Sequence, residues 1–158
     1  MSTKAIPEGR EGLIPHLVCD PCSEAIEFYK KVFGAEELTR VPSPDGQKLM
    51  HAAIRIGNAT VFLADDFPEY CDGVSHSPKS LNAAPITIHR YVEDCDAAIA
   101  RAEQAGATVK MPAQDMFWGD RYGVITDPFG HNWSFATHVS DKTPEELAAS
   151  MKEAFGMA

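Results

Sequence analysis

An internal repeat at an offset of 73 positions constrains the fold of this chain more than any other feature. Four residues of the first half recur in the second half at this offset. The matched pairs are His16 with His89, Cys22 with Cys95, Ala25 with Ala98, and Ile26 with Ile99. With one residue deleted, Gly34-Ala35 also matches Gly106-Ala107. Composition alone would not usually produce so many coincidences, so the chain is predicted to contain two similar modules.

Each module is predicted to contain one strand, one helix and three further strands. Apolar runs at residues 13–19 and 86–92 predict the first strands, and apolar residues at helical spacing predict helices over 22–33 and 94–105. The remaining strands are predicted at 36–41, 48–56 and 59–65, and at 108–111, 121–126 and 131–138. Turn sequences such as Pro44-Asp45-Gly46 separate them. This order predicts an α+β fold of two tandem βαβββ modules.

The modules are predicted to occupy residues 13–65 and 85–138. Residues 1–12 are polar and contain Gly and Pro, which predicts a flexible arm, and the prolines and mixed polarity of 66–84 predict a linker. In residues 139–158, Thr143 precedes Pro144 and two glutamates, which is typical of a helix start. Leu147, Met151 and Phe155 then give this tail helix one apolar side, which could pack on its own chain or on a partner.

Composition limits the partners and the compartment. A chain of 158 residues that is 44% hydrophobic can bury a core of its own, and a net charge of −9 disfavours nucleic acid as a partner. The sequence has no apolar run near the roughly 20 residues that span a bilayer and no secretory signal pattern. Four cysteines without such a signal suit a reducing compartment. We therefore expect a cytoplasmic protein with no membrane or nucleic-acid partner.

Three stretches carry a resemblance to a known family: residues 24–35 (EAIEFYKKVFGA), 91–94 (YVED) and 127–131 (DPFGH). They resemble the vicinal oxygen chelate superfamily, which contains glyoxalase I, extradiol dioxygenases, fosfomycin-resistance enzymes and bleomycin-resistance proteins. Residues 50–52 and 117–123 are similar to its glyoxalase-like branch, which includes phosphonate-operon-associated, PhnB-like proteins. The resemblance implies that the modules form curved mixed sheets around a cavity. It also implies a homodimer, because superfamily members usually pair modules within or between chains.

The resemblance also locates the positions that bind a metal ion in other members. There, four His, Gln or Glu ligands come from the first and last strands of the two modules. The corresponding positions here are Ile14 (or Leu13, if the helix entry is one residue shorter), Phe62, Thr87 and Ser134. None of these residue types supplies a usual ligand for a divalent ion, so no metal and no other cofactor is expected.

Strand alternation selects the candidate ligand-binding residues. It predicts that Leu13 and Leu17 face the helix while His16 faces the cavity, and that Ile86 faces the helix while His89 and Tyr91 face the cavity. Along 49–56, an apolar face of Met50, Ala52, Ile54 and Ile56 leaves His51 and Arg55 on the other side. Residues 117–122 combine aromatic side chains with an arginine and an acid, which is typical of a binding surface or lid. The candidates are His16, His51, Arg55, Phe62, His89, Tyr91, Trp118 and Arg121.

Two functions fit these residues. The first is a metal-free protein of the bleomycin-resistance type, which binds an aromatic or cationic small molecule in the cavity. The alternative is a glyoxalase-like enzyme, of lyase or dioxygenase type, in which His16, His51 or His89 acts as a general base or holds a displaced metal ion. We expect His16 and His89 to share the cavity and to have lowered pKa values. Whether a reaction is catalysed, and by which residues, is left open by the sequence.

The motif Cys19-Asp20-Pro21-Cys22 has two interpretations. A CxxC pair is a redox motif in a thioredoxin context, and the helix dipole would favour the Cys22 thiolate. Cys95 occupies the same place in the second module, however, which favours small residues packed beneath each helix.

Overall fold

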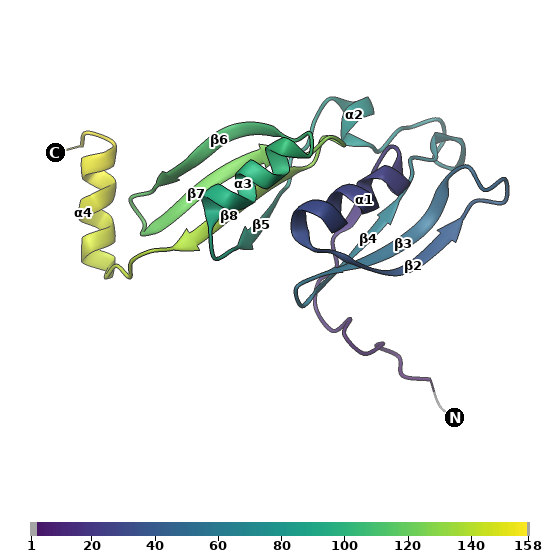
Figure 1. Ribbon diagram of the computed structural model, residues 1–158, viewed down its shortest axis with the longest axis horizontal. Helices are drawn as coiled ribbons and strands as arrows, with labels where there is room; N and C mark the ends of the chain where they lie inside the picture. The colour runs from purple at the N-terminus through teal and green to yellow at the C-terminus, as the bar shows by residue number, and fades with distance from the viewer. Residues whose placement is uncertain (1–2, 158) are drawn as a thin grey trace. The chain divides into compact units, whose positions relative to one another are not determined.

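Two four-stranded mixed sheets, each with one helix across one face, make up the computed structural model, which describes residues 3–157 (Figure 1). The chain divides after Ala84 into two compact units, referred to below as unit 1 and unit 2. Unit 1 contains β1 (His16–Val18), α1 (Cys22–Phe33), β2 (Glu36–Pro42), β3 (Leu49–Ile56) and β4 (Ala59–Ala64). Unit 2 contains β5 (Thr87–Tyr91), α3 (Cys95–Gln104), β6 (Thr108–Asp115), β7 (Asp120–Thr126) and β8 (Asn132–His138).

The two sheets have the same topology. Their strand orders are β1-β4-β3-β2 and β5-β8-β7-β6, and each sheet is open rather than closed. The first and last strands of each unit pair in parallel, and the other neighbours pair antiparallel. The prediction of an α+β fold with two βαβββ modules is therefore confirmed.

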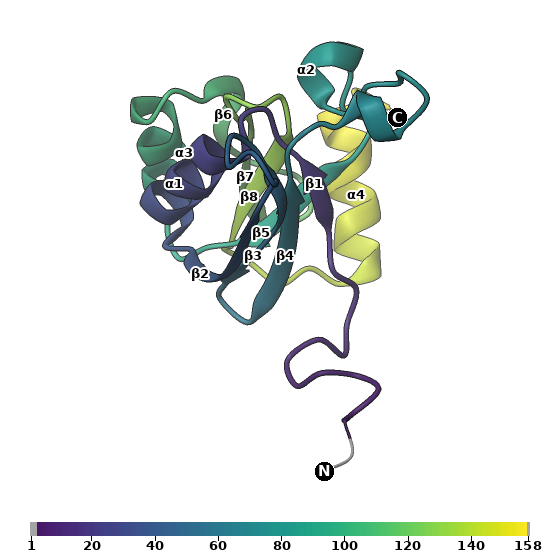
Figure 2. The same ribbon diagram turned by 90° about the vertical axis from the view of Figure 1, so that its right-hand side faces the viewer.

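Each helix covers one face of its own sheet, as both views show (Figure 2). The helical spacing of α1 buries Ala25, Ile26, Tyr29, Val32 and Phe33. In unit 2, Ile99, Trp133 and Phe135 are buried in the corresponding layer between α3 and its own sheet. A Cβ at Gly123 in β7 would collide with the side chain of Ile99, so glycine permits the close approach of α3 to the sheet.

Residues distant in sequence satisfy the first backbone N–H of each helix. In unit 1, Asp65 follows β4, and its carboxylate accepts bonds from the backbone N–H of Cys22 (2.9 Å) and of Leu49 (2.7 Å). In unit 2, the hydroxyl of Thr137 accepts the N–H of Cys95 at 2.9 Å and donates to the carbonyl of Val92. Each contact ties the start of the helix to the end of the last strand.

The predicted strand alternation is wrong at three positions. Leu13 is fully exposed and Ile86 is 73% exposed, although both were expected to face a helix. The paired strands begin only at His16 and Thr87, and alternation orients side chains only where the backbone is paired. Met50 is also exposed, because it lies beside a register shift between β2 and β3.

The strand predicted at 108–111 continues to Asp115 as β6. Pro112 lies in it between two register shifts, and β6 is an edge strand of its sheet. An edge strand tolerates proline because one side of its backbone needs no ladder partner.

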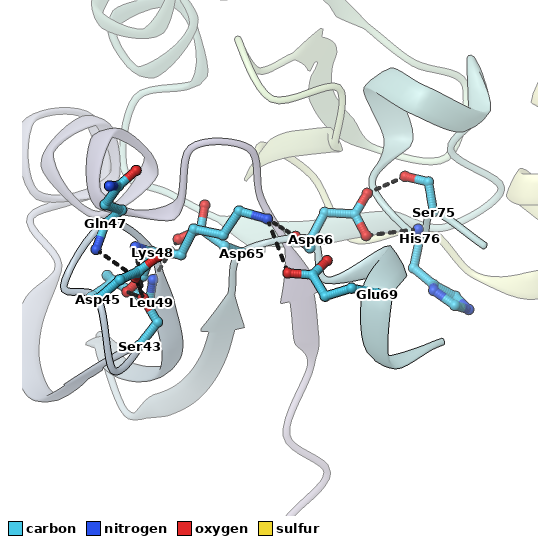
Figure 3. A network of polar contacts seen from close by, with 10 residues as sticks. All are labelled: Ser43, Asp45, Gln47, Lys48, Leu49, Asp65, Asp66, Glu69, Ser75 and His76. Carbon is cyan, nitrogen blue, oxygen red and sulfur yellow. Dashed lines mark hydrogen bonds and ion pairs between the residues drawn. The ribbon is translucent and has the colours of Figure 1, made fainter. Parts of the chain in front are cut away.

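The segment predicted as a linker is folded against unit 1 (Figure 3). It contains the short helices η1 (Pro68–Tyr70) and α2 (Pro78–Leu81). The carboxylate of Asp66 accepts bonds from the Ser75 hydroxyl and from the backbone N–H of His76 (3.1 Å) and Ser77 (3.2 Å). Lys48 donates to the backbone carbonyl of Asp66 at 2.7 Å. These bonds attach residues 66–77 to the end of the first sheet.

The tail helix α4 spans Pro144–Ala154 and begins with a capping box of Thr143 and Glu146. Its apolar side chains are exposed: Leu147 by 38%, Met151 by 42% and the following Phe155 by 67%. None of the helices in the described part of the chain has the length and apolar character that a bilayer crossing requires.

Candidate functional site

The face of each sheet opposite its helix carries most of the candidate residues. The face of unit 1, which we call the first open face, carries His16, His51, Arg55 and Phe62, since β1 pairs His16 with Phe62 and β3 presents every second side chain on that side. The second open face, on unit 2, carries His89 on β5, Ser134 opposite it on β8, and Tyr91 with Tyr122 in the adjacent row. The sharing of one cavity by His16 and His89 stays a prediction.

Aromatic rings gather around Phe62 on the first open face. The His51 ring centroid lies 4.8 Å from that of Phe62, and the His16 centroid lies 6.0 Å from it, both in edge-to-face geometry. The two imidazole centroids are 6.3 Å apart. The guanidinium carbon of Arg10, from the N-terminal arm, lies 5.2 Å from the centre of the Phe62 ring. Four side chains from four segments therefore meet here.

Of the titratable side chains that the structure describes on this face, Arg55 is paired with a carboxylate, whereas the two histidines are not. Burial, and then the neighbouring His51, lower the pKa of His16 below its ordinary 6.5, so this imidazole is neutral near pH 7. Arg55, another predicted site residue, forms an ion pair with Glu36 on β2. Arg55 is thus occupied by a carboxylate, whereas His16 and His51 contact other rings.

Four aromatic rings define the centre of the second open face. The His89 centroid lies 4.9 Å from that of Tyr91 and 6.0 Å from that of Tyr122, with the Tyr122 ring nearly parallel to the imidazole. Trp118 lies 5.5 Å from Tyr122. The Nδ1 atom of His89 is 2.7 Å from the hydroxyl oxygen of Ser134, which is 2% exposed. The predicted residues His89, Tyr91 and Trp118 are therefore brought together.

A buried carboxylate beneath this face orients two of these rings. Asp120 is 5% exposed, and its Oδ2 accepts bonds from the Tyr91 hydroxyl (2.9 Å) and the Trp118 indole N–H (3.1 Å). Its other oxygen lies 2.8 Å from Nδ1 of His138, whose Nε2 lies 2.9 Å from Asp141. A buried carboxylate with three partners is a rigid, satisfied network.

The network shifts the titration of its members. Burial alone would raise the pKa of Asp120, but the bonds from His138, Tyr91 and Trp118 outweigh it and hold the pKa below its ordinary value. Hydrogen bonds to Asp120 and Asp141 raise the pKa of His138. The bond to Asp120 likewise raises the pKa of Tyr91. Asp120 is therefore ionised at neutral pH, and His138 is the group whose charge it stabilises.

Arg121 is the predicted residue that the structure places apart from the others. Its guanidinium pairs with Asp96 on α3, with Nη2 2.8 Å from Oδ1, and with Asp115 on β6 at 3.2 Å. It therefore lies on the helix side of the second sheet. Phe117, in the predicted lid, lies 5.1 Å from Trp118 and 5.8 Å from Phe155 after the tail helix.

Sequence reasoning did not single out Arg10, Asp120, Tyr122 or His138 as site residues. Alternation along β8 offers a signal for His138, because Ser134, Ala136 and His138 share one side of the strand. Asp120 was visible only as one acid in an aromatic stretch. The sequence carried no sign that Arg10 lies over Phe62.

The CxxC cysteines are buried thiols. Cys19 and Cys22 are both fully buried and are not joined in a disulfide, and burial and then Asp65 raise the pKa of Cys22 to about 12. The expectation that the helix dipole favours a Cys22 thiolate is therefore wrong, because loss of solvent outweighs the dipole. Cys95 is also buried, and its thiol donates to the carbonyl of Phe135 at 3.3 Å. These positions support packing rather than redox chemistry.

The positions that correspond to metal ligands do not fit a divalent ion. Phe62 is a hydrocarbon and is surrounded by rings, while the Ser134 hydroxyl is bound to His89. Strand register pairs Phe62 with His16 and Ser134 with His89, two residues beyond Ile14 and Thr87. Within residues 3–157, no three His, Cys, Asp or Glu side chains are grouped so that they could hold a metal ion.

Comparison with known proteins identifies the family. The model of the glyoxalase/bleomycin resistance protein/dioxygenase superfamily matches residues 14–135, which include the first sheet and all of the second except the end of β8. This chain belongs to that superfamily. The superfamily assignment agrees with the resemblance found in the sequence.

One sequence relative and two solved structures are similar to this chain. The uncharacterized protein Rv0887c of Mycobacterium tuberculosis is 53% identical over 139 residues, covering 88% of this chain and 81% of that protein. The crystal structure of TioX from Micromonospora sp. ML1 is 25% identical, covers 81% of this chain and all of TioX, and has a TM-score of 0.62. A Bacillus cereus PhnB protein, titled a putative 3-demethylubiquinone-9 3-methyltransferase, shares the fold at 16% identity, 80% and 99% coverage, and a TM-score of 0.62.

Proposed function

We propose that this protein binds a small aromatic molecule on its second open face, without the metal site of other superfamily members. The observation that carries this proposal is the position of Tyr91 and Trp118, which both donate to the buried carboxylate of Asp120. Their rings are held beside His89 and Tyr122, and Tyr91 is 59% exposed. Rings fixed in advance lose little side-chain entropy when a ligand stacks on them.

The chemistry of this face favours a planar ligand that carries a positive charge. Aromatic rings attract flat apolar molecules and cations over their faces. Asp120 adds a negative charge beneath the rings, and the chain as a whole has a net charge of −9. A cationic aromatic compound therefore suits both the rings and the field around them.

A calorimetric titration tests this proposal with three matched probes: 1-naphthylmethylammonium, 1-naphthylmethanol and 1-naphthoate. We expect affinity to decrease in that order. Replacement of Tyr91 by Ala should weaken binding of the cation by about two- to tenfold, the range of one aromatic contact. Tyr70→Ala is the matched control, because Tyr70 is an exposed tyrosine of unit 1, and it should leave binding unchanged. Equal effects of both variants, or no binding of the cation, would contradict the proposal.

The enzyme alternative has a separate test. It requires a histidine that can act as a base or hold a displaced metal ion. His16 meets this requirement, because its lowered pKa leaves the imidazole neutral near pH 7. Elemental analysis of protein purified without a tag or chelator should show less than one metal ion per chain. Stoichiometric Ni, Zn, Mn or Fe would favour the enzyme instead.

We also propose that the chain forms a homodimer, as the superfamily resemblance implies. The exposed apolar side of the tail helix, Leu147, Met151 and Phe155, supports a second copy as its partner. Sedimentation at micromolar concentration should show twice the 17.2 kDa chain mass. Met151→Glu should shift the species toward the monomer, whereas Ala149→Glu on the other side of the helix should not.

A further inference from the structure

We propose that the first open face contains an oxyanion-binding site, in which Arg10, His16 and His51 surround Phe62 and receive the carboxylate or phosphonate group of a small molecule. This site is distinct from the aromatic face of unit 2 and selects the opposite charge. It goes beyond the proposed function, which concerns unit 2 alone.

The first observation is the convergence of three nitrogen-bearing groups on one ring. Arg10 lies on the N-terminal arm, His16 on β1 and His51 on β3, and each is within 6.0 Å of the Phe62 centroid. The arm is attached to the sheet where the Thr60 hydroxyl donates to the carbonyl of Gly9 at 3.3 Å. This bond holds the backbone next to Arg10 against the sheet and so keeps the guanidinium near Phe62.

The second observation is that no carboxylate pairs with these three groups within the described residues, although carboxylates pair with several cations of the same unit. Lys30 lies 2.8 Å from Glu37, Arg40 lies 2.8 Å from the same carboxylate, and Arg55 pairs with Glu36. Within residues 3–157, by contrast, no ion pair involves Arg10, His16 or His51. Because no described carboxylate pairs with Arg10, the charge of its guanidinium is available to an external anion.

The chemistry of the groups selects an oxyanion over a metal ion or a cation. The guanidinium remains charged at all relevant pH values and matches the geometry of carboxylate and phosphonate oxygens. Its charge would repel a divalent ion placed between the imidazoles. Phe62 and the edges of the histidine rings offer apolar contact for the rest of the ligand.

Proton binding at this site should be coupled to anion binding. His16 lies against His51 and Phe62, whose ring Arg10 also contacts, and its lowered pKa reflects burial and His51. On the same face, the carboxylate of Glu36 is paired with Arg55. A bound anion would stabilise the imidazolium form and raise the pKa of His16. Affinity should therefore increase as the pH falls from 8 to 6.

Histidine NMR on the full chain tests the site. The probes are benzoate and phenylphosphonate, with benzyl alcohol as the neutral match, and His16→Gln and His51→Gln assign the two ring signals. Both anions should shift both signals and raise the pKa of His16, whereas benzyl alcohol should do neither. Binding of only one anion would restrict the site to carboxylates or to phosphonates.

Substitution of Arg10 separates a binding role from a structural one. Arg10→Ala should weaken benzoate binding about tenfold or more, as expected for loss of a charge-assisted bond, and Arg10→Lys should restore part of the affinity. Lys31→Ala, an equal change of charge on the exposed side of α1, is the control and should change affinity less than about twofold. Thermal denaturation of Arg10→Ala checks that it remains folded.

Three results would overturn the oxyanion site: equal binding of benzyl alcohol, an unchanged affinity of Arg10→Ala, or ring shifts caused by Zn²⁺ but not by either anion. Failure here is distinguishable from failure of the proposed function. The naphthyl cation is tested by Tyr91→Ala in unit 2, whereas the benzoate signals arise from His16 and His51 in unit 1.

Discussion

Unit 1 and unit 2 share a backbone plan but carry opposite chemistry on their open faces. Each has four strands in the same order, a parallel pair of first and last strands, and a histidine at the same repeat position, His16 or His89. On unit 1, two imidazole rings and the guanidinium of Arg10 surround Phe62. On unit 2, the side chain opposite the histidine is Ser134, and a buried Asp120 binds three donors.

This difference shows where a duplicated module is constrained. Ile26 in α1 and Ile99 in α3 occupy matching repeat positions, and both are buried between their helix and its sheet. Side chains on the open faces make no such contribution to the helix–sheet core, so they can differ without changing the fold. The repeat therefore predicts the scaffold of both units and does not predict that they bind the same ligand.

The largest expected effect is a difference in stability loss between substitutions on the helix-covered face and on the open face of each sheet. Ile26→Ala and Ile99→Ala should each lower the free energy of unfolding by about 2–5 kcal/mol, because a buried aliphatic side chain is replaced by a cavity. His16→Ala and His89→Ala should each cost about 1 kcal/mol or less. Urea denaturation measures all four. A loss above about 2 kcal/mol for either histidine would show that its face belongs to the core.

The next effect distinguishes the two helix-start contacts. Asp65→Ala leaves two backbone N–H groups without their charged acceptor and should cost about 2–4 kcal/mol, whereas Thr137→Val removes two bonds of a neutral hydroxyl, to the Cys95 N–H and the Val92 carbonyl, and should cost about 1–2 kcal/mol. Denaturant unfolding of both variants gives the comparison. Equal losses would contradict the expectation that the carboxylate bonds of Asp65 are stronger than the hydroxyl bonds of Thr137.

A smaller effect is expected from the network that exists only in unit 2. Tyr91→Phe keeps the ring and removes one of three bonds to Asp120, so it should lower the free energy of unfolding by about 1 kcal/mol. It should weaken binding of the naphthyl cation less than Tyr91→Ala does. Calorimetry and urea unfolding on the same samples provide both values. If Tyr91→Phe weakened binding of the cation while Tyr91→Ala left it unchanged, the assigned role of the ring would be contradicted.

The smallest effect is an opposite pH dependence of two histidines. The pKa of His138 is raised by Asp120 and Asp141, so its stabilising contribution is complete below pH 6.5 and is lost as the pH rises through the raised value. The pKa of His16 is lowered by burial and His51, so its contribution is complete above pH 6.5 and is lost as the pH falls toward the lowered value. NMR titration should place the two midpoints on opposite sides of 6.5, and His138→Gln should abolish the alkaline loss alone. Midpoints on the same side would refute the comparison.

Local sequence signals predicted the elements well because they depend on near neighbours. The spacing of Ala25, Ile26 and Tyr29 defines α1, and the Thr143 capping box defines the start of α4. Errors arose where local pattern continued beyond the paired strand, as at Leu13 and Ile86. The candidate residues His16, His51, His89 and Tyr91 were selected by alternation, which holds within each strand. Phe62 came from the resemblance, and Trp118 from the composition of residues 117–122.

The sequence by itself determined the repeat, the two βαβββ modules and the side of the strand on which His16, His51, His89 and Tyr91 lie. Only the tertiary structure decided the partners of those residues. Asp120 meets Tyr91 from 29 positions earlier and His138 from 18 positions later, and Asp65 binds the start of a helix 43 positions earlier. Arg10 meets Phe62 from an arm with no regular structure. Such contacts depend on the pairing register of whole strands and on how segments between them fold back, which no local pattern encodes.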